Sequence, residues 1–264
     1  MSKIDECFAK LRAEGKKAFV PFITAGDPDL ATTEALIREL ASRGASICEV
    51  GIPYSDPIAD GPVIQASYTR ALDAGVKLAD IFAMLKRASA EVDIPLLTMV
   101  SYSIVLRHGP QQYVDDAVAA GVSGLIVPDL PVDESSALAS ICRKADLGLV
   151  HLVTPTTPKE RAVRIARAST GFLYYVSVAG ITGERRELPA ELVENVRWLA
   201  AQTDVPVCIG FGISTPEHVR QLSPVADGLI VGSAIVRRVG ESGAGEATVK
   251  AVGEYVAELL AAYA

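Results

Sequence analysis

Hydrophobic residues along the chain gather in eight short, nearly continuous runs. The runs are rich in Val, Ile, Leu and Phe and show little alternation with polar residues, which is typical of parallel strands covered by helices. They span residues 18–25, 47–51, 96–101, 124–127, 148–153, 171–176, 207–211 and 227–231. The pattern therefore predicts eight buried parallel strands.

Between these runs the apolar residues recur with the spacing of one helix face. Prolines at or near helix starts, such as Pro158 and Pro216, and glycines just after helix ends, such as Gly44 and Gly121, support the boundaries. The predicted helices span 4–14, 29–43, 78–90, 111–120, 135–144, 158–168, 190–202 and 216–222, followed by one from Ile235 onward and one over 246–263.

Strand and helix alternate without a linker rich in Pro, Gly or Ser. We therefore expect residues 1–264 to form one catalytic domain of the α/β class, a single (β/α)8 TIM barrel with an extra N-terminal helix and additional helices in its loops. An open doubly wound sheet is the alternative architecture, and it usually has a GxGxxG turn after its first strand. Here that strand runs into TAGDP at residues 24–28, which favours the barrel.

Composition and charge narrow the classes of function. Half of the 264 residues are hydrophobic and 22% are charged, which excludes a disordered chain. The net charge of −7 argues against a nucleic-acid partner. No apolar stretch approaches the ~18 residues of a membrane span, and charged residues stand where a signal peptide needs apolar ones. Four scattered cysteines without a CxxC pair indicate reduced thiols, so we expect a cytoplasmic protein.

Glu49 is the strongest candidate for catalysis. It lies in the predicted strand 47–51, and both faces of a barrel strand are normally apolar, one inside the barrel and one under the helices. Burial disfavours an ionised carboxylate and raises its pKa, as a general acid/base at neutral pH requires. A structural salt bridge is the alternative, but no other predicted strand carries Lys or Arg to form it.

Asp60 follows in a loop over residues 53–62 that is stiffened by several prolines. It precedes Gly61 and Pro62, where a helix can begin, so a role as N-cap competes evenly with a functional one. Asp56 in the same loop has the weaker claim, because a carboxylate in a turn normally faces solvent.

Three glycine-containing turns follow the last three predicted strands: GITG at 180–183, GFGIS at 210–214 and GSA at 232–234. Glycine allows the backbone to approach an anion closely, and the first amides of a helix point toward such a ligand. Phosphate sites are frequent at this end of a barrel. The turns predict a phosphate site made of backbone amides, and the long loop 179–189 is a candidate lid or, alternatively, a mobile surface loop.

The sequence lacks the usual patterns of a metal site and of a catalytic serine. No His, Cys, Asp and Glu residues stand at the spacing of metal ligands, and no serine lies in a GxSxG elbow. We therefore expect no metal. Aromatic residues at predicted strand ends could sandwich a flat ligand, although a role in the core is the simpler interpretation.

The stretch 49–62, EVGIPYSDPIADGP, is similar to the signature of the tryptophan synthase alpha chain family. PFITAGDP at 21–28 and the three glycine turns also resemble this family, in its order and spacing, from about Ile4 to the last helix. Two positions depart from the family pattern. Cys48 stands where an aliphatic residue is usual, and Pro128 stands where some members have alanine.

The resemblance implies a lyase that cleaves indole-3-glycerol phosphate to indole and glyceraldehyde 3-phosphate. It implies that Glu49 protonates indole C3 and takes the glycerol hydroxyl proton, that Asp60 holds or accepts the indole N–H proton, and that Tyr174 lies beside the glutamate. The remaining matches to family substrate contacts are Gly183, Gly212, Gly232 and Ser233 at the phosphate, Phe22, Val100, Tyr102, Phe211 and Ile230 at the indole, and Thr182, which orients Asp60.

The resemblance also implies a partner. An alpha chain carries no cofactor and works in an α2β2 assembly with a beta chain, which holds pyridoxal phosphate and condenses indole with serine to form L-tryptophan. Residues 53–62 and 102–109 resemble the surfaces that meet this partner.

Three alternatives remain open at this point. A stand-alone lyase that releases free indole has the same catalytic residues. A non-catalytic barrel that only activates a partner is disfavoured by the intact Glu49, Asp60 and Tyr174. An isomerase or epimerase of sugar phosphates accounts for the glycine turns but not for the stretch 49–62.

Overall fold

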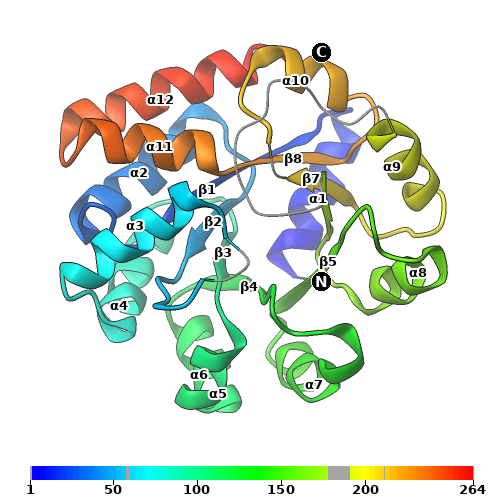
Figure 1. The fold of residues 1–264 in the computed structure, drawn as a ribbon, viewed down its shortest axis with the longest axis horizontal. Helices are drawn as coiled ribbons and strands as arrows, with labels where there is room; N and C mark the ends of the chain where they lie inside the picture. Colours follow the sequence, from blue (N-terminus) through cyan, green and yellow to red (C-terminus); the bar gives the residue numbers. More distant parts are fainter. Residues whose placement is uncertain (1, 58–59, 178–190, 211, 264) are drawn as a thin grey trace.

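Eight parallel strands form a closed barrel in chain order in the computed structural model, and helices surround it (Figure 1). The structure describes residues 2–57, 60–177, 191–210 and 212–263. Every strand pairs with its neighbours along the chain, and β1 pairs with β8 to close the barrel. The strands are β1 (Ala18–Thr24), β2 (Cys48–Gly51), β3 (Leu96–Met99), β4 (Val122–Ile126), β5 (Gly148–Val153), β6 (Leu173–Val176), β7 (Val207–Gly210) and β8 (Gly228–Val231). The predicted barrel is confirmed.

The helices also follow the predicted pattern, with two additions. The short helix α5 and most of α3 were outside the predicted set, and a 3-10 turn, η1 (Val132–Glu134), follows β4. No helix in the described part of the chain has both the length and the apolar composition of a membrane span. The helices are α1 (Lys3–Ala13), α2 (Leu30–Arg43), α3 (Pro62–Asp73), α4 (Leu78–Ser89), α5 (Tyr102–His108), α6 (Pro110–Ala119), α7 (Ser136–Lys144), α8 (Lys159–Ala168), α9 (Leu192–Ala200), α10 (Pro216–Leu222), α11 (Ser233–Ser242) and α12 (Glu246–Leu260).

The core has two layers, because successive side chains of a strand point to opposite sides. On β2, Cys48 and Val50 pack in the outer layer between strands and helices. Ile47, just before this strand, packs inside the barrel with Leu97, Tyr174 and other residues of the inner cluster. The family departure at Cys48 therefore faces the helices, away from the barrel interior.

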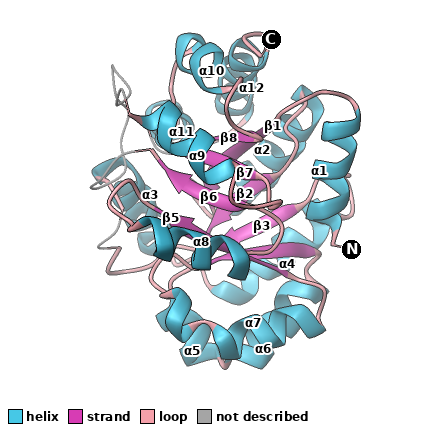
Figure 2. Cartoon of the chain, turned by 90° about the vertical axis from the view of Figure 1, so that its right-hand side faces the viewer, coloured by secondary structure: helices cyan, strands magenta, loops and turns pink. Residues whose placement is uncertain are grey.

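Helix α1 closes the amino-terminal end of the barrel. Ser2 forms a capping box with Asp5 at its start, which satisfies backbone amides that have no partner within the helix. Ile4 is fully buried, and its Cδ1 lies so close to Gly124 and Gly148 that a Cβ on either glycine would be within 2.9 Å of it. Figure 2 shows α1 at one end of the barrel, beside the N-terminus.

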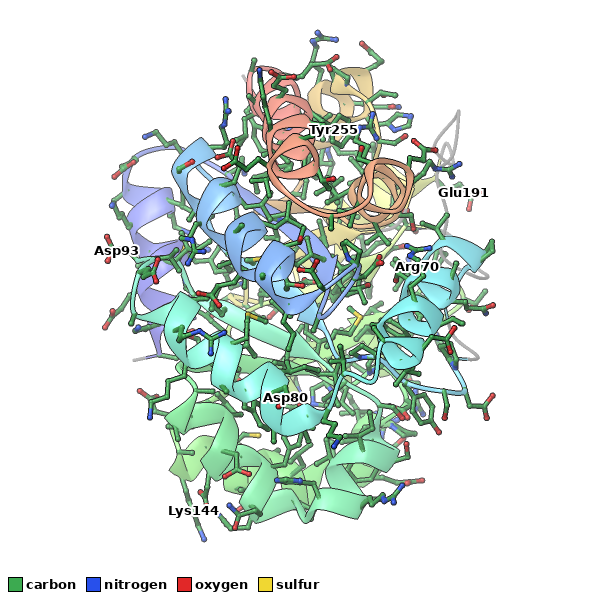
Figure 3. The ribbon with its side chains drawn as sticks, turned by 90° about the vertical axis from the view of Figure 1, so that its left-hand side faces the viewer. Arg70, Asp80, Asp93, Lys144, Glu191 and Tyr255 are labelled. Carbon is green, nitrogen blue, oxygen red and sulfur yellow. The ribbon has the colours of Figure 1, made fainter. Side chains whose placement is uncertain are left out.

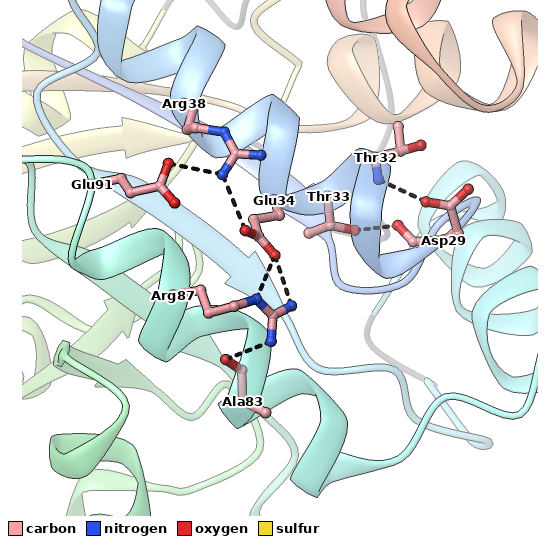
Figure 4. A network of polar contacts seen from close by, with 8 residues as sticks. All are labelled: Asp29, Thr32, Thr33, Glu34, Arg38, Ala83, Arg87 and Glu91. Carbon is pink, nitrogen blue, oxygen red and sulfur yellow. Dashed lines mark hydrogen bonds and ion pairs between the residues drawn. The ribbon is translucent and has the colours of Figure 1, made fainter.

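A polar network joins the neighbouring helices α2 and α4 on the outside of the barrel (Figure 4). Glu34 accepts hydrogen bonds from Arg38 (3.0 Å) and Arg87 (2.7 Å), and Arg38 also donates to Glu91 (2.9 Å). Asp29 caps the start of α2 by accepting from the Thr32 amide. Each exposed ion pair of this kind contributes little to the free energy of folding. The contact between the two helices is a sufficient role for these charged residues.

Candidate active site

Glu49 lies inside the barrel, between Phe22 of β1 and Leu97 of β3 in the sheet register. Its side chain is 0% exposed, and neither carboxyl oxygen has a hydrogen-bond partner among the described residues. The structural alternative, a salt bridge, is therefore not formed within the part of the chain that the structure describes. Burial holds the pKa of the carboxyl well above its usual range. Burial thus favours the protonated form of Glu49, which can give a proton.

Tyr174 on β6 belongs to the same inner layer, where it packs with Ile47 and Leu97. Its hydroxyl occupies space that a side chain at Gly210 would fill, since a Cβ there would collide with it. Burial raises the pKa of the phenol, and the charge of Glu49 adds to the rise. Tyr174 is therefore a neutral phenol close to Glu49.

Asp60 lies at the carboxyl end of the barrel, immediately before α3. Gly61 occupies the N-cap position of this helix without a side-chain cap, so the alternative role of Asp60 as N-cap does not apply. Its carbonyl oxygen accepts a hydrogen bond from Gln65 Nε2 at 2.7 Å, which ties the end of the loop to α3. Burial raises the pKa of its carboxyl to about 6, and the charge of Asp129 contributes.

Helix α3 is itself anchored to the loop after β1. The Arg70 Nε and Nη2 atoms each donate a hydrogen bond of 2.7 Å to the Asp27 carboxylate, which is almost completely buried. Figure 3 shows Arg70 on α3 below α11, and its guanidinium approaches Gly240 so closely that a Cβ there would lie 2.8 Å from Nη2. This pairing fixes the helix that follows Asp60.

Asp129 was not among the sequence candidates, although it follows β4 at the same end of the barrel as Asp60. Its carboxylate accepts hydrogen bonds from the Ser101 hydroxyl (2.7 Å) and the Tyr102 amide (2.8 Å) at the start of α5. An acidic residue shortly after a buried strand was the available signal. Asp56, by contrast, is exposed in the described part of its loop.

The residues expected around the indole lie in different layers. Phe22 packs with Ile64, Tyr68 and Val236 near the mouth of the barrel, and Ile230 lies in the inner layer. Val100 packs in the outer layer, and Tyr102 is partly buried against that layer. Met99, which the sequence did not single out, contacts both the inner layer and the Phe22 cluster.

The expected phosphate contacts that the structure describes, Gly212, Gly232 and Ser233, lie beyond the ends of two neighbouring strands. Cys208 of β7 is opposite Gly228 of β8 in the sheet register, and Gly212 and Gly232 follow these two residues by the same number of positions. Gly232 is the N-cap of α11 and Ser233 its first residue, so the first amides of a ten-residue helix face the space beyond β8. A helix N-terminus next to a glycine turn suits an anion. Gly212 has the left-handed φ of +81° that glycine tolerates.

Three expected site residues, Thr182, Gly183 and Phe211, lie outside the described residues, as does the candidate lid over 179–189. Within the described ranges there is no group of three or more His, Cys, Asp or Glu residues that could hold a metal ion. The four cysteines are free thiols, three of them buried, which agrees with the expectation from their spacing.

Comparison with known proteins identifies the family. The model of the tryptophan synthase alpha chain family matches residues 8–263. The chain belongs to this family. The alpha chain of Rhodopirellula baltica is 57% identical over 245 residues, covering 92% of this chain and 88% of the relative. The alpha chain of Rippkaea orientalis is 45% identical over 260 residues, covering 98% and 97%.

Solved alpha-chain structures share the whole architecture. The tryptophan synthase alpha subunit of Legionella pneumophila superposes with a TM-score of 0.91 at 34% identity, covering 99% of this chain and 98% of that one. A chain from the tryptophan synthase complex of Pyrococcus furiosus gives 0.86 at 36% identity, covering 92% and 98%. The protein is therefore an alpha chain of tryptophan biosynthesis, the carbon–carbon lyase that cleaves indole-3-glycerol phosphate, and not an isomerase or epimerase.

Proposed function

We propose that this alpha chain cleaves indole-3-glycerol phosphate with Glu49 and Asp60 as its proton-transfer groups and Tyr174 beside Glu49. The observation that supports this most is the complete burial of Glu49 with both carboxyl oxygens unpartnered among the described residues. A buried carboxyl without a partner is costly to keep in a core. It is well suited to exchange protons with a bound ligand.

The reaction divides between the two acids. Glu49 gives its proton to indole C3 while Asp60 takes the proton from the indole nitrogen, which leaves a neutral indolenine. Glu49, now a carboxylate, removes the proton from the hydroxyl on the carbon attached to C3. The O–H electrons form the aldehyde C=O, the carbon–carbon bond breaks, and its electron pair returns to the ring as Asp60 gives back the nitrogen proton. Two carboxyl groups in different environments can perform acid and base steps together in this way.

A second group of residues binds the phosphate and the indole ring of the substrate. The amides at Gly212, Gly232 and Ser233, together with Gly183, bind the phosphate at the ends of β7 and β8 and the start of α11. The indole is surrounded by Phe22, Val100, Tyr102, Phe211 and Ile230, and Thr182 orients Asp60. Backbone amides serve this role without a cation.

We infer that the alpha chain acts as one catalytic domain over residues 1–264 in the cytoplasm and assembles with a beta chain. A solved relative from Pyrococcus furiosus is an α2β2 tryptophan synthase complex. In such an assembly the beta chain holds the pyridoxal phosphate, and the alpha chain needs no cofactor. The loop over 53–62 and α5 (Tyr102–His108) are the surfaces for this partner.

Replacing Glu49 with glutamine tests the catalytic assignment. Glu49→Gln keeps the shape of the side chain but removes proton transfer, so indole release should fall by roughly 100- to 10,000-fold. Binding of an analogue that lacks the reactive hydroxyl, measured by calorimetry, should stay within a few-fold of wild type. Asp93→Asn, an exposed acid before β3 that Figure 3 shows across the barrel from Arg70, serves as the control. Indole release by Glu49→Gln within a few-fold of wild type removes Glu49 from the mechanism.

A further inference from the structure

The proposed phosphate contacts come from two separate segments of the chain. Gly212 lies in the turn after β7, whereas Gly232 and Ser233 lie at the start of α11. Backbone amides bind an anion well only when they converge on it, so the two segments must be held at a fixed distance and angle. Side chains that join these two segments are therefore candidates for a positioning role.

Ser214, in the turn after β7, is held by side chains at both of its backbone polar groups. Its carbonyl oxygen accepts a hydrogen bond of 2.8 Å from the Tyr255 hydroxyl of α12, and its amide donates one of 3.3 Å to Nδ1 of His218 on α10. Ile213, between Gly212 and Ser214, is buried in the outer layer of the core. The turn that carries Gly212 is therefore anchored to the helices that cover the barrel.

Tyr255 also contacts the helix that carries the other half of the phosphate site. Its side chain is 6% exposed, and the guanidinium of Arg238 on α11 lies over its ring, with Cζ 3.4 Å from the ring centroid. A cation in this position is attracted to the face of the ring. Arg238 Nη1 also donates a hydrogen bond of 2.8 Å to the carbonyl oxygen of Ala234, in the first turn of α11. Figure 1 shows α12 alongside α11, and Figure 3 labels Tyr255 on α12.

We propose that Tyr255 is a positioning residue for phosphate binding, because it joins the turn at Ser214 to the first turn of α11 and so fixes the two sets of amides relative to each other. This inference rests on the proposed phosphate contacts at Gly212, Gly232 and Ser233. Tyr255 acts through the backbone of Ser214, and the proton-transfer groups lie on other elements of the barrel. Its contribution therefore belongs to the binding of the phosphate rather than to the chemical step.

Tyr255→Phe tests this role, because it removes the hydrogen bond to Ser214 and keeps the ring under Arg238. In the complex with saturating beta chain, KM for indole-3-glycerol phosphate should rise by roughly 3- to 10-fold, as for the loss of one hydrogen bond, while kcat stays near wild type. The inhibition constant of inorganic phosphate, which probes the phosphate contacts alone, should rise by the same factor. A purely structural role of Tyr255 would lower stability but change neither constant.

Tyr263→Phe is the matched control. The Tyr263 hydroxyl donates a hydrogen bond of 3.0 Å to the carbonyl oxygen of Ala18, the first residue of β1, at the opposite end of the barrel. This variant should therefore keep the wild-type KM and inhibition constant. A Tyr255→Phe enzyme with wild-type values of both constants, or one whose loss is confined to kcat, overturns the inference.

Ser233→Asp separates this inference from the proposed phosphate site. It places a negative charge at the first residue of α11, where the charge suits the helix dipole but repels a phosphate. KM should therefore rise by more than in Tyr255→Phe. If Ser233→Asp binds the substrate as tightly as wild type, the phosphate site itself fails. If Ser233→Asp weakens binding and Tyr255→Phe does not, only the inference about Tyr255 fails.

Discussion

Glu49 and Asp60 have the same functional group but different surroundings. Glu49 is enclosed by the strands of the barrel, where no described residue compensates its charge. Asp60 lies at the mouth, half-buried, and shares its surroundings with Asp129. Burial raises the pKa of both carboxyl groups, to about 6 at Asp60, which is therefore largely ionised at neutral pH, while the complete burial of Glu49 favours its protonated form. This difference is what a concerted exchange of protons needs.

The charge of Asp129 offers a test of this difference. Asp60 has to be ionised to accept a proton, so kcat/KM should fall as the pH decreases through about 6, the raised pKa of its carboxyl. Asp129→Asn removes a neighbouring negative charge and should lower the pKa of Asp60, which moves the acid limb to lower pH. Burial remains and is the larger cause, so the limb should stay above the ordinary value for an aspartate.

The pH dependence of kcat/KM between pH 5 and 8 measures this shift, and Ser101→Ala is the control. That variant removes one hydrogen bond to Asp129 but keeps its charge, so its acid limb should stay near that of wild type. An unmoved limb in Asp129→Asn, or one that moves to higher pH, contradicts the assignment.

Among the elements, buried strands were predictable and short helices were not. The strands β1 and β5 span nearly the same residues as the apolar runs that predict them. A strand that is covered on both faces consists almost entirely of hydrophobic residues, so its bounds can be read from the sequence. Helix α5, at seven residues, is too short to show a helical period. The start of α3 was visible only as Pro62 after Asp60.

The site was predictable where one strand or turn carries the signal. Glu49 stands out because a carboxylate interrupts an apolar strand, and Gly232 because a glycine turn runs into a helix. Asp129 has no such local signal, since its relation to Asp60 exists only after distant segments come together. Val100 shows the same limit: it immediately follows β3 and packs in the outer layer, while Met99 contacts the inner one.

Helix α1 illustrates an element whose role is structural. Ile4→Ala should lower the free energy of unfolding by about 2–5 kcal/mol, because it leaves a cavity against Gly124 and Gly148 at the closed end of the barrel. Ile4→Val should cost only about 0.5–1.5 kcal/mol. Urea unfolding followed by circular dichroism measures both. Indole release under native conditions should remain near wild type, and equal stabilities of the two variants would show that Ile4 does not seal this end.

At the scale of the whole molecule, the two ends of the barrel have different tasks. Helix α1 fills the amino-terminal end with apolar contacts, whereas the carboxyl end collects Glu49, Asp60 and Asp129, the glycines at 212 and 232, and α5. Asp129 links two of these parts, because it is held at the start of α5 and its charge acts on Asp60. A protein that binds over α5 and the loop over 53–62 is thus in direct contact with the groups that position Asp60.

Indole release by the purified chain, alone and with its cognate beta chain, tests this coupling. Binding of the beta chain selects the arrangement of loop and α5 that places Asp60 correctly, so we expect the rate to rise by roughly 5- to 150-fold, the usual range of coupling between sites. The Glu49→Gln chain with the beta chain should release no more indole than the mutant alone, which excludes a contribution from the partner. Rapid release by the wild-type chain that the beta chain leaves unchanged would instead identify a stand-alone lyase, with Asp60 already in place in the isolated barrel.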